Sequence, residues 1–265
     1  MILSVIIPCY NHGQYIQEAI DSVLTYQDQP IEIIIIDDGS IEAFTISKIK
    51  ELKQKGFEVL QHQNSGLAFS RNAGISAAKG KYILPLDADN KIKADYIRKA
   101  LSLLENNEAD IVYARPIFFG DDIAERKFET KKFGGLDIVF GNYIDACAIF
   151  KKEVWIKNKG YDESMPYPGV EDWEFWVNSF FNNFRFYFLD KALYEYRILK
   201  NSMIEQLFQE KKYDESRKYI FYKHYESINQ RLLEIYHHSS VYLNDQKKPL
   251  KTALKYIKNW FISHE

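Results

Sequence analysis

The stretch KYILPLDADN, residues 81–90, joins a short apolar run to two closely spaced carboxylates. The run at 82–86 predicts a buried β-strand. Asp87 and Asp89 follow it directly, and because residues two apart on an extended chain face the same way, both side chains should project from the strand's carboxyl end. Ligands of open α/β sheets bind at this edge, so the stretch predicts a strand and a site together.

Two ionised carboxylates side by side repel each other unless a cation balances their charge. The hard oxygen atoms of Asp87 and Asp89 suit Mg²⁺ or Mn²⁺, and Mg²⁺ is held by one or two carboxylates together with substrate phosphates. The same Asp-x-Asp-Asn order is also common in surface turns. On this stretch alone, a metal site and a surface turn both stay open.

Segments on either side of this stretch alternate between strand patterns and helix patterns. Apolar, β-branched runs predict strands at 2–8, 31–36 and 57–60. Apolar residues at helical spacing predict helices at 16–24, 46–52 and 67–78. Strands that alternate with helices of this length form βαβ units, so the expected fold class is α/β with a mainly parallel or mixed sheet.

Beyond residue 90 the pattern continues, with a helix predicted at 94–104 and further strands at 110–118 and 145–150. The polar segment 120–135 predicts a long loop. An aromatic-rich block follows at 151–200, and everything after residue 201 has a helical pattern.

The composition excludes several classes of protein. The chain of 265 residues is 46% hydrophobic and 27% charged, which is typical of a globular protein. Its formal net charge of −2 offers no basic field for nucleic acid. Cys9 and Cys147 are too few for a disulfide framework. Because neither a signal peptide nor a membrane span is expected, we predict a cytoplasmic protein, soluble or at most peripheral to a membrane.

A dinucleotide-binding oxidoreductase is the first alternative for such a sheet. That class needs Gly-x-Gly-x-x-Gly after the first strand. Here the turn at 8–13 reads PCYNHG and contains a single glycine. The sequence therefore disfavours this alternative.

Four loops are expected at the same carboxyl edge of the sheet. They contain an aromatic residue, Tyr10, a carboxylate, Asp38, and an arginine, Arg71, in addition to the Asp-x-Asp pair. An aromatic face, hydrogen-bonding side chains and a cation suit the base and the phosphates of a nucleoside diphosphate. Each residue also has a simpler explanation, since Tyr10 could pack, Asp38 could cap a helix, and Arg71 could pair with a nearby carboxylate.

Taken together, these segments resemble the family 2 glycosyltransferases, which have the GT-A fold. The resemblance covers about the first 200 residues and rests on SVIIPCYN at 4–11, IIIIDDGS at 33–40, NSGLAFSRNAGISAAKGKYILPLDADN at 64–90 and GVEDWEFW at 169–176. It implies the transfer of a sugar, with inversion, from a nucleotide-sugar that is usually UDP-linked. It also implies a role in bacterial surface polysaccharide synthesis, with a glycan or a lipid-linked saccharide as the acceptor.

The same resemblance implies a domain organisation. Residues 1–200 would form the catalytic domain, with a nucleotide-binding half at about 1–115 and an acceptor-binding half at about 116–200. Residues 201–265 would form a helical extension.

Roles for individual residues follow from the resemblance. The base would be contacted by Pro8, Tyr10, Asp38 and Arg71, and Asn11 and Gly66 belong to the same nucleotide-binding motifs. Asp87 would approach the ribose. Asp89, with Asp87 in the same DXD motif, would bind a divalent metal, Mn²⁺ or Mg²⁺, on the diphosphate.

Inverting transfer also needs a base that takes the proton of the acceptor hydroxyl. Glu171 and Asp172 lie where a Pro- and Gly-containing loop runs into a predicted helix, whose first turn favours an anion. We take Asp172 as the base and Glu171 as the alternative. Trp173 and Trp176 share one helical face, and we favour buried core residues over an acceptor platform for both.

One segment departs from the family pattern. Family members often carry a Tyr-Arg-x-His segment that helps to hold the metal or the diphosphate, and Leu199 stands here in place of that histidine. Arg197 could still reach the diphosphate, and Lys200 could supply charge. His12 and His62 stay without a role.

The tail carries two helical patterns. An apolar stripe, expected to pack on the catalytic domain or on a second copy in a homodimer, consists of Phe221, Tyr225, Ile228, Leu232 and Ile235. Residues 249–262 predict a basic amphipathic helix, which could lie on an anionic membrane or dock on the protein body.

Two further functions remain as alternatives. A sugar-nucleotide nucleotidyltransferase would need a glycine-rich, basic loop after the first strand, which the sequence lacks. A catalytically degenerate nucleotide-sugar-binding protein that acts through its helical tail has Leu199 as its only support.

Overall fold

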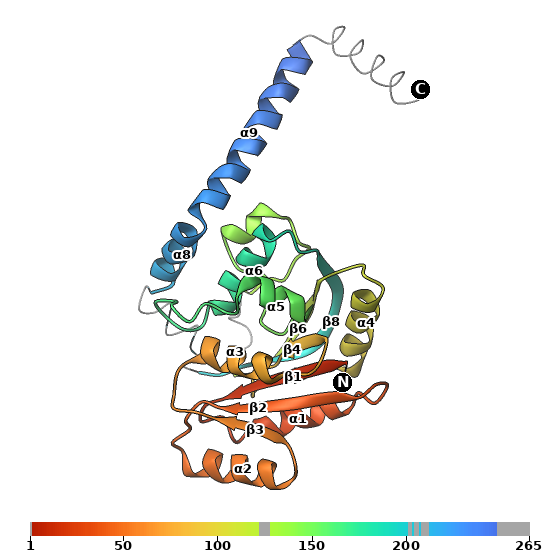
Figure 1. Cartoon of the computed structure of the whole chain (residues 1–265), viewed down its shortest axis with the longest axis vertical. Helices are drawn as coiled ribbons and strands as arrows, with labels where there is room; N and C mark the ends of the chain where they lie inside the picture. The colour runs from red at the N-terminus through yellow and green to blue at the C-terminus, as the bar shows by residue number, and fades with distance from the viewer. Residues whose placement is uncertain (1, 122–127, 201–202, 204–206, 208–211, 248–265) are drawn as a thin grey trace. The chain divides into compact units, whose positions relative to one another are not determined.

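The computed structural model describes residues 2–121, 128–200, 203, 207 and 212–247 (Figure 1). The chain divides into two compact units, and the boundary in the sequence lies between Ile220 and Phe221. The first unit contains the sheet and every residue of the site described below. The basic helix predicted at 249–262 lies outside the described residues.

The described residues form one eight-stranded sheet, in the order β3-β2-β1-β4-β7-β6-β8-β5. Neighbours pair in parallel at β1/β2, β1/β4, β2/β3 and β6/β8, and antiparallel at β4/β7, β6/β7 and β5/β8. The strands are β1 Leu3–Cys9, β2 Ile31–Asp37, β3 Glu58–Gln61, β4 Tyr82–Pro85, β5 Lys91–Ile92, β6 Ile111–Gly120, β7 Ile149–Lys151 and β8 Phe186–Ile198.

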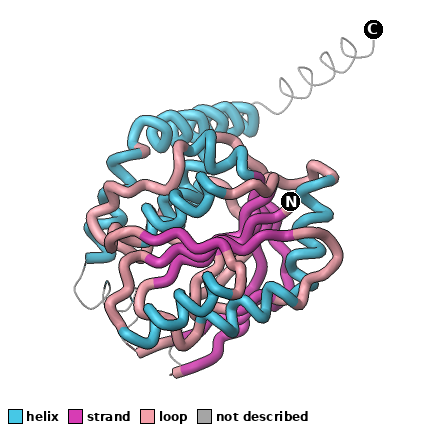
Figure 2. Tube along the Cα trace, turned by 60° about the horizontal axis from the view of Figure 1, so that its bottom comes forward, coloured by secondary structure: helices cyan, strands magenta, loops and turns pink. Residues whose placement is uncertain are grey.

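Helices lie on both sides of this sheet, as Figure 2 shows for the magenta layer of strands. The described helices are α1 Ile16–Leu24, α2 Ala43–Gln54, α3 Leu67–Ala77, α4 Ala94–Glu105, α5 Lys152–Asn158, α6 Glu171–Phe181, α8 Lys212–Lys223 and α9 Tyr225–Lys247, with a short 3₁₀ turn, η2, at Leu136–Val139. Of these, α9 belongs to the second compact unit. The expected strands and helices of the first hundred residues are confirmed. Their ends differ from the predicted ends by at most three residues.

The parallel half of the sheet is buried on both faces because its strands are almost continuously apolar. All seven residues of β1 are buried. Alternate side chains, such as those of Val5 and Ile7, join the core with α1 and α4. The other face receives α3, where a Cβ added to Gly74 would lie 2.5 Å from Ile6 Cγ2. This close approach packs α3 against Ile6 of β1 and Ile36 of β2.

The strand predicted at 145–150 is shorter than expected, since β7 begins only at Ile149. Side chains form hydrogen bonds with the backbone groups that would otherwise pair with the neighbouring strand. The N–H of Cys147 donates to Asp145 Oδ1 at 2.9 Å, and the Cys147 carbonyl accepts a hydrogen bond from the Tyr96 hydroxyl at 3.0 Å. Such local bonds compete with sheet formation. Residues 145–148 therefore form an irregular segment that leads into β7.

The apolar stripe from Phe221 to Ile235 predicted one continuous helix. This prediction is wrong, because α8 ends at Lys223 and α9 begins at Tyr225. Neither glycine nor proline marks this break, so apolar spacing alone could not reveal it. Ile228 is buried, whereas Leu232 and Ile235 are 44% and 47% exposed. Among the described residues, no helix is long and apolar enough to cross a membrane.

Candidate active site

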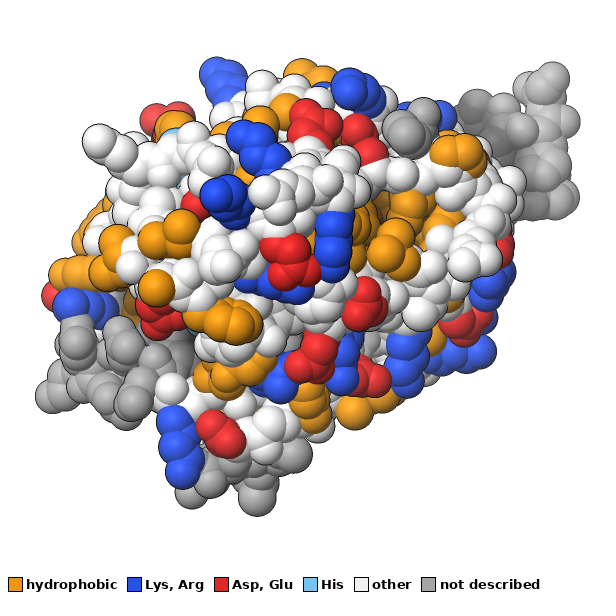
Figure 3. All heavy atoms as spheres, turned by 90° about the horizontal axis from the view of Figure 1, so that it is seen from below, with side chains coloured by type: hydrophobic (Ala, Val, Ile, Leu, Met, Phe, Trp, Pro, Cys, Tyr) orange, Lys and Arg blue, Asp and Glu red, His pale blue; other side chains and the backbone are white. Residues whose placement is uncertain are grey.

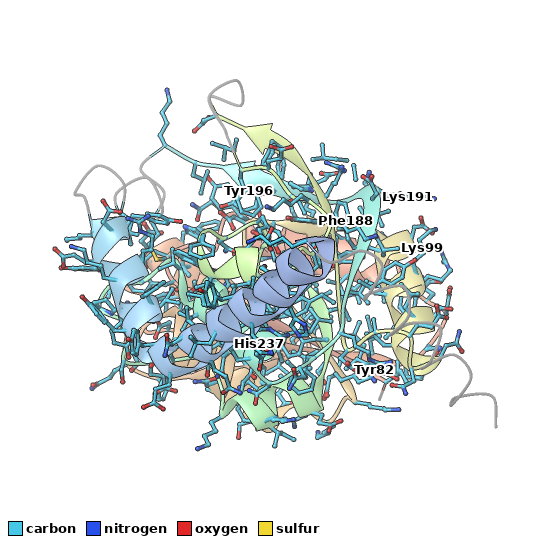
Figure 4. The ribbon with its side chains drawn as sticks, turned by 90° about the horizontal axis from the view of Figure 1, so that it is seen from above. Tyr82, Lys99, Phe188, Lys191, Tyr196 and His237 are labelled. Atoms are coloured by element: carbon cyan, nitrogen blue, oxygen red, sulfur yellow. The ribbon has the colours of Figure 1, made fainter. Side chains whose placement is uncertain are left out.

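A cavity of about 610 Å³ opens at the carboxyl edge of the sheet. Most of the site residues expected from the sequence line it, namely Pro8, Tyr10, Asp38, Gly66, Arg71, Asp87, Asp89, Glu171, Asp172 and Arg197. Tyr196 of β8, labelled in Figure 4, lines it as well. Side chains from positions 8 to 197 therefore share one cavity, within the first compact unit.

Asp38 joins two of the loops that form one end of this cavity. Its carboxylate accepts hydrogen bonds from the backbone N–H groups of Ser65 at 2.8 Å and Gly66 at 3.1 Å. Gly66 has a φ of 90°, a conformation that favours glycine, and it directly precedes α3. A carboxylate has about four acceptor sites, so Asp38 can hold this loop and still accept from a ligand.

Tyr10 and Asn11, neighbours in the sequence, take different positions. Tyr10 is 41% exposed and offers its ring to the cavity. Asn11 lies outside the cavity lining, and its Oδ1 accepts hydrogen bonds from the N–H groups of Ile41 and Glu42. Asn11 therefore holds the loop that leads into α2.

Arg71 occupies the centre of the site. It is 1% exposed, and it donates to Asp87 Oδ1 at 2.8 Å and to Glu171 Oε1 at 2.6 Å. Arg71 and Glu171 are 100 residues apart in the sequence. The sequence led us to expect Arg71 on the nucleotide base. In the structure its guanidinium lines the cavity and lies between the two acidic pairs, joining one carboxylate of each, and its contact with a base stays a prediction.

Asp89 has a different environment from Asp87. Burial, together with the charge of Asp87, raises the pKa of the Asp89 carboxyl to about 7. Among the described residues Asp89 takes part in no ion pair, so its charge is not balanced as that of Asp87 is. A hard carboxylate oxygen in such a place fits a divalent cation.

The donor set indicates what kind of metal site this is. In the part of the chain that the structure describes, no group of three or more His, Cys, Asp or Glu side chains could enclose a metal ion. A cation at Asp89 would therefore need ligands from elsewhere. Diphosphate oxygens are the usual complement for Mg²⁺. The residues fit a cation shared with a substrate, rather than one held by the protein alone.

The second acidic pair opens α6. Glu171 is 3% exposed, and its Oε2 accepts from the Gly169 N–H at 2.7 Å while Oε1 accepts from Arg71. Both oxygens of Glu171 are thus engaged. Asp172 accepts neutral hydrogen bonds, from the Trp173 N–H and from Asn142 Nδ2.

The surroundings of Asp172 favour its protonated form. Burial first, and then the charge of Glu171, raise the pKa of Asp172 well above its ordinary value, although Arg71 opposes the shift. A carboxylate with a raised pKa is a stronger base. Asp172, rather than Glu171, is therefore the group suited to accept a proton in this cavity.

Arg197 supports the turn that carries Asp89. Its Nε donates to the Asp89 carbonyl at 3.0 Å and its Nη2 donates to Glu18 at 2.8 Å. The guanidinium also lies 4.5 Å from the ring centroid of Tyr15 and 4.3 Å from that of Phe119. Arg197 lines the cavity, but its donors already hold protein groups. Leu199 and Lys200 line the cavity beyond it.

Trp173 and Trp176 are core residues, as the sequence favoured. Both are fully buried. Their indole N–H groups donate to the carbonyls of Ile138 at 2.6 Å and Ile144 at 3.0 Å. The two side chains thereby tie α6 to the segment that precedes β7.

That segment contributes a residue that the sequence analysis did not single out. Asp145 lines the cavity together with Ala146. No motif surrounds it, and more than fifty residues separate it from the Asp-x-Asp pair. Only the antiparallel pairing of β7 with β4 brings it there.

The comparisons with known proteins identify the family. A family model described as "Glycosyl transferase family 2" matches residues 4–196. The chain belongs to glycosyl transferase family 2. The matched range contains every residue expected to have a role in binding or catalysis except Arg197.

Relatives within family 2 can be named. Glycosyltransferase GlyG of Streptococcus pneumoniae is 35% identical over 42% of this chain and 38% of its own length. TuaG of Bacillus subtilis, a glycosyltransferase named for teichuronic acid biosynthesis, is 26% identical over 76% of this chain and 81% of its own. The chain thus covers well under half of GlyG.

A solved structure of S. aureus TarS, residues 1–349 in complex with UDP, superposes with a TM-score of 0.62. The two sequences are 24% identical, and the match covers 75% of this chain and 61% of the TarS chain. TarS has also been solved with UDP-GlcNAc. The likeness confirms the predicted α/β fold of the GT-A type.

Proposed function

We propose that this family 2 chain is an inverting glycosyltransferase. It would transfer a sugar from a nucleoside-diphosphate sugar, UDP-linked, to a hydroxyl acceptor. The observation that carries the proposal is the arrangement around Arg71. One cavity contains a carboxylate suited to a cation, Asp89, and a carboxylate suited to a proton, Asp172, with the arginine joined to the neighbour of each.

The donor end supports a nucleotide. Tyr10 offers an exposed ring on which a base can stack, beside Pro8 and the Asp38 carboxylate. Asp87, held by Arg71, keeps an oxygen for a ribose hydroxyl. UDP is the nucleotide that we propose, because the TarS structure that shares this fold contains it. On the face shown in Figure 3, acidic and basic side chains are interspersed, which agrees with a small-molecule ligand rather than nucleic acid.

The chemistry follows from the positions of the two acidic pairs. The acceptor hydroxyl gives its proton to Asp172 as its oxygen attacks the anomeric carbon, and the bond from that carbon to the diphosphate breaks. Attack comes from the side opposite the diphosphate, so the anomeric configuration inverts. A divalent cation, Mn²⁺ or Mg²⁺, when bound at Asp89, would neutralise charge on the departing diphosphate. Arg197 holds the Asp89 turn in place.

The acceptor proposal is a glycan or a lipid-linked saccharide in surface polysaccharide synthesis. Its support is the relative named for teichuronic acid biosynthesis, which covers most of this chain. Pro168 and Gly169 line the cavity beside Asp172 and belong to the half of the domain, at about 116–200, that we propose binds the acceptor. We place the reaction in the cytoplasm, at the inner face of the membrane where a lipid-linked acceptor is met.

Release of UDP from a panel of UDP-sugars, with Mn²⁺ and with or without oligosaccharide acceptors, tests the proposal. The unmodified chain should release UDP from at least one sugar, and Asp172→Asn should be slower by about 10²–10⁴-fold, the usual contribution of a positioned base. Asp190→Asn, which changes a carboxylate with 67% side-chain exposure, is the matched control and should match the unmodified chain. Equal slow release by the unmodified chain and Asp172→Asn would contradict the assignment and favour a degenerate binding protein.

A further inference from the structure

Ser70 of α3 has a hydroxyl group that the fold leaves unused. The residue is fully buried, and its Oγ has no hydrogen-bond partner among the described residues. A serine inside a helix can donate to the carbonyl four residues earlier. Ser179 of α6, which is equally buried, does so, and its Oγ lies 2.8 Å from the Phe175 carbonyl oxygen. The Ser70 hydroxyl makes no such bond, although this residue also lies inside a helix.

The packing of α3 places Ser70 at the carboxyl edge of the sheet. α3 joins β3 to β4, which both lie in the parallel half of the sheet, so the helix runs back across the strands. A Cβ added to Gly74 would lie 2.5 Å from Ile6 Cγ2 and 2.7 Å from Ile36 Cδ1. Ser70 comes one turn earlier on the same face of the helix. It therefore lies nearer than Gly74 to the carboxyl ends of β1 and β2.

The Asp38 carboxylate lies at this same end. The Ser70 N–H donates to the Gly66 carbonyl at 3.0 Å, and the Gly66 N–H donates to Asp38 Oδ2 at 3.1 Å. Asp38 Oδ1 accepts the Ser65 N–H at 2.8 Å and lies 3.2 Å from His62 Nδ1. A carboxylate oxygen has two acceptor sites, so Oδ2 keeps one for a ligand. Asp38 and Ser70 both line the cavity, as an acceptor and a donor.

An acceptor and a donor close together complement an N–H group next to a carbonyl oxygen. Uracil has this arrangement at its ring N–H, with a carbonyl oxygen on each side. Guanine has a carbonyl oxygen on one side only. Cytosine and adenine have a ring nitrogen without a proton at the corresponding position, and its lone pair is repelled by a carboxylate. The hydroxyl and the carboxylate therefore suit uracil best.

The burial of Ser70 increases what a ligand would gain from this hydroxyl. A buried donor without a partner costs stability, because it has lost its hydrogen bonds to water. Folding has already removed the Ser70 hydroxyl from water. A carbonyl oxygen of a ligand can then accept its hydrogen bond without a further cost of desolvating the donor.

We propose that the Ser70 hydroxyl donates a hydrogen bond to a carbonyl oxygen of the uracil base, beside the Asp38 carboxylate. The inference rests on the proposed function and adds a group that recognises the base. Ser70 is a specificity-determining residue in this account, and it takes no part in the transfer of the sugar.

Calorimetric titration of the full chain with Mn²⁺ provides the first test. The ligands are UDP, 2-thio-UDP and 4-thio-UDP, in which sulfur, a weak acceptor, replaces one carbonyl oxygen or the other. We expect the unmodified chain to bind one of the two analogues about fivefold or more weakly than UDP. That analogue identifies the oxygen that Ser70 contacts.

Ser70→Ala should remove this discrimination. The variant should bind UDP about fivefold more weakly than the unmodified chain does, and it should bind UDP and the sensitive analogue alike. Its midpoint of unfolding in urea, measured without ligand, should stay the same or rise. The reason is that the variant loses a hydroxyl without a partner and gains a better helix former.

Ser179→Ala is the matched control, since it removes a buried hydroxyl from another helix. Ser179 Oγ also accepts Asn158 Nδ2 at 2.7 Å, so its removal leaves buried groups without a partner. This variant should unfold at a lower urea concentration. The ratio of its affinities for UDP and for the sensitive analogue should equal that of the unmodified chain.

Three outcomes would overturn the inference. The first is equal binding of the three ligands by the unmodified chain, and the second is equal affinity for UDP in Ser70→Ala and the unmodified chain. The third is a Ser70→Ala variant that still discriminates against the analogue, or that unfolds at a lower urea concentration, which would give the hydroxyl a structural role. Failure of the unmodified chain to bind UDP at all would instead contradict the proposed function itself.

Discussion

The two acidic pairs of the cavity, Asp87 with Asp89 and Glu171 with Asp172, resemble each other more closely than their sequences indicate. The first follows a strand and the second opens a helix. In each pair one carboxylate is bound to Arg71, and the pKa of the other is raised. We propose that this single buried arginine divides each pair into a structural member and a reactive one.

The difference between the pairs lies in what surrounds the reactive member. Asp89 sits on a turn held by Arg197, and its pKa is raised only to about 7. It is suited to share a cation with a substrate. Asp172 lies in the first turn of α6, with Glu171 beside it and neutral donors on both oxygens, and its pKa is raised well above its ordinary value. It is suited to accept a proton.

Removal of Arg71 should break both pairs at once and give the largest effect on stability. Arg71→Met leaves Glu171 buried without a counter-charge, and we expect the free energy of unfolding in urea to fall by about 3–5 kcal/mol. The double variant Arg71→Met, Glu171→Gln should recover much of that loss. Arg115→Met, which removes an exposed pair with Asp190, should cost less than about 1 kcal/mol. A loss in Arg71→Met no larger than in Arg115→Met would show that Arg71 does not join the two pairs.

Asp89→Asn should weaken UDP binding only when a metal is present, which would assign the metal to the first pair. With Mn²⁺ present, we expect UDP to bind the variant at least about tenfold more weakly, because a charged ligand to the cation is lost. With EDTA, the variant and the unmodified chain should bind UDP alike. Titration calorimetry measures both conditions. A deficit of the same size in EDTA would mean that Asp89 contacts the nucleotide without a metal.

Asp172→Asn should change stability less than Arg71→Met does, and it should increase it. The pKa of Asp172 is raised in the folded chain, so the ionised form costs stability once the pH exceeds the ordinary value of 3.8. The variant lacks that cost and should therefore be more stable than the unmodified chain near neutral pH. The gain should vanish below about pH 4. Thermal unfolding at several pH values measures it, and a gain that is independent of pH would contradict the shift.

Much of the fold could be predicted because its signals are local. The apolar run before Cys9 and the helical spacing from Ile16 each report their own structure, and the first hundred residues follow them. The segment 145–148 could not be predicted as irregular. Its apolar pattern indicates a strand, whereas bonds from Asp145 and Tyr96 take its backbone groups. The second of those bonds spans 51 residues and leaves no local signal.

The site divides in the same way. Asp87, Asp89 and Asp172 belong to motifs that the sequence shows directly, and the structure brings them into one cavity. The contact of Arg71 with Glu171 spans 100 residues, and no spacing rule predicts it. Asp145 carries no motif at all. Its place follows from the antiparallel pairing of a three-residue strand, β7, that was predicted with the wrong start.

The central claim is that, in the second pair, Glu171 is structural and Asp172 is reactive. The most direct test is to measure sugar transfer as a function of pH in two variants, Glu171→Gln and Asp172→Asn. Glu171 raises the pKa of Asp172, so Glu171→Gln should keep transfer and move the acidic limb of kcat/KM to lower pH. Asp172→Asn should lose transfer, by about 10²–10⁴-fold, over the whole range. Loss of transfer in Glu171→Gln at every pH, with Asp172→Asn still active, would reverse the two roles and contradict the account.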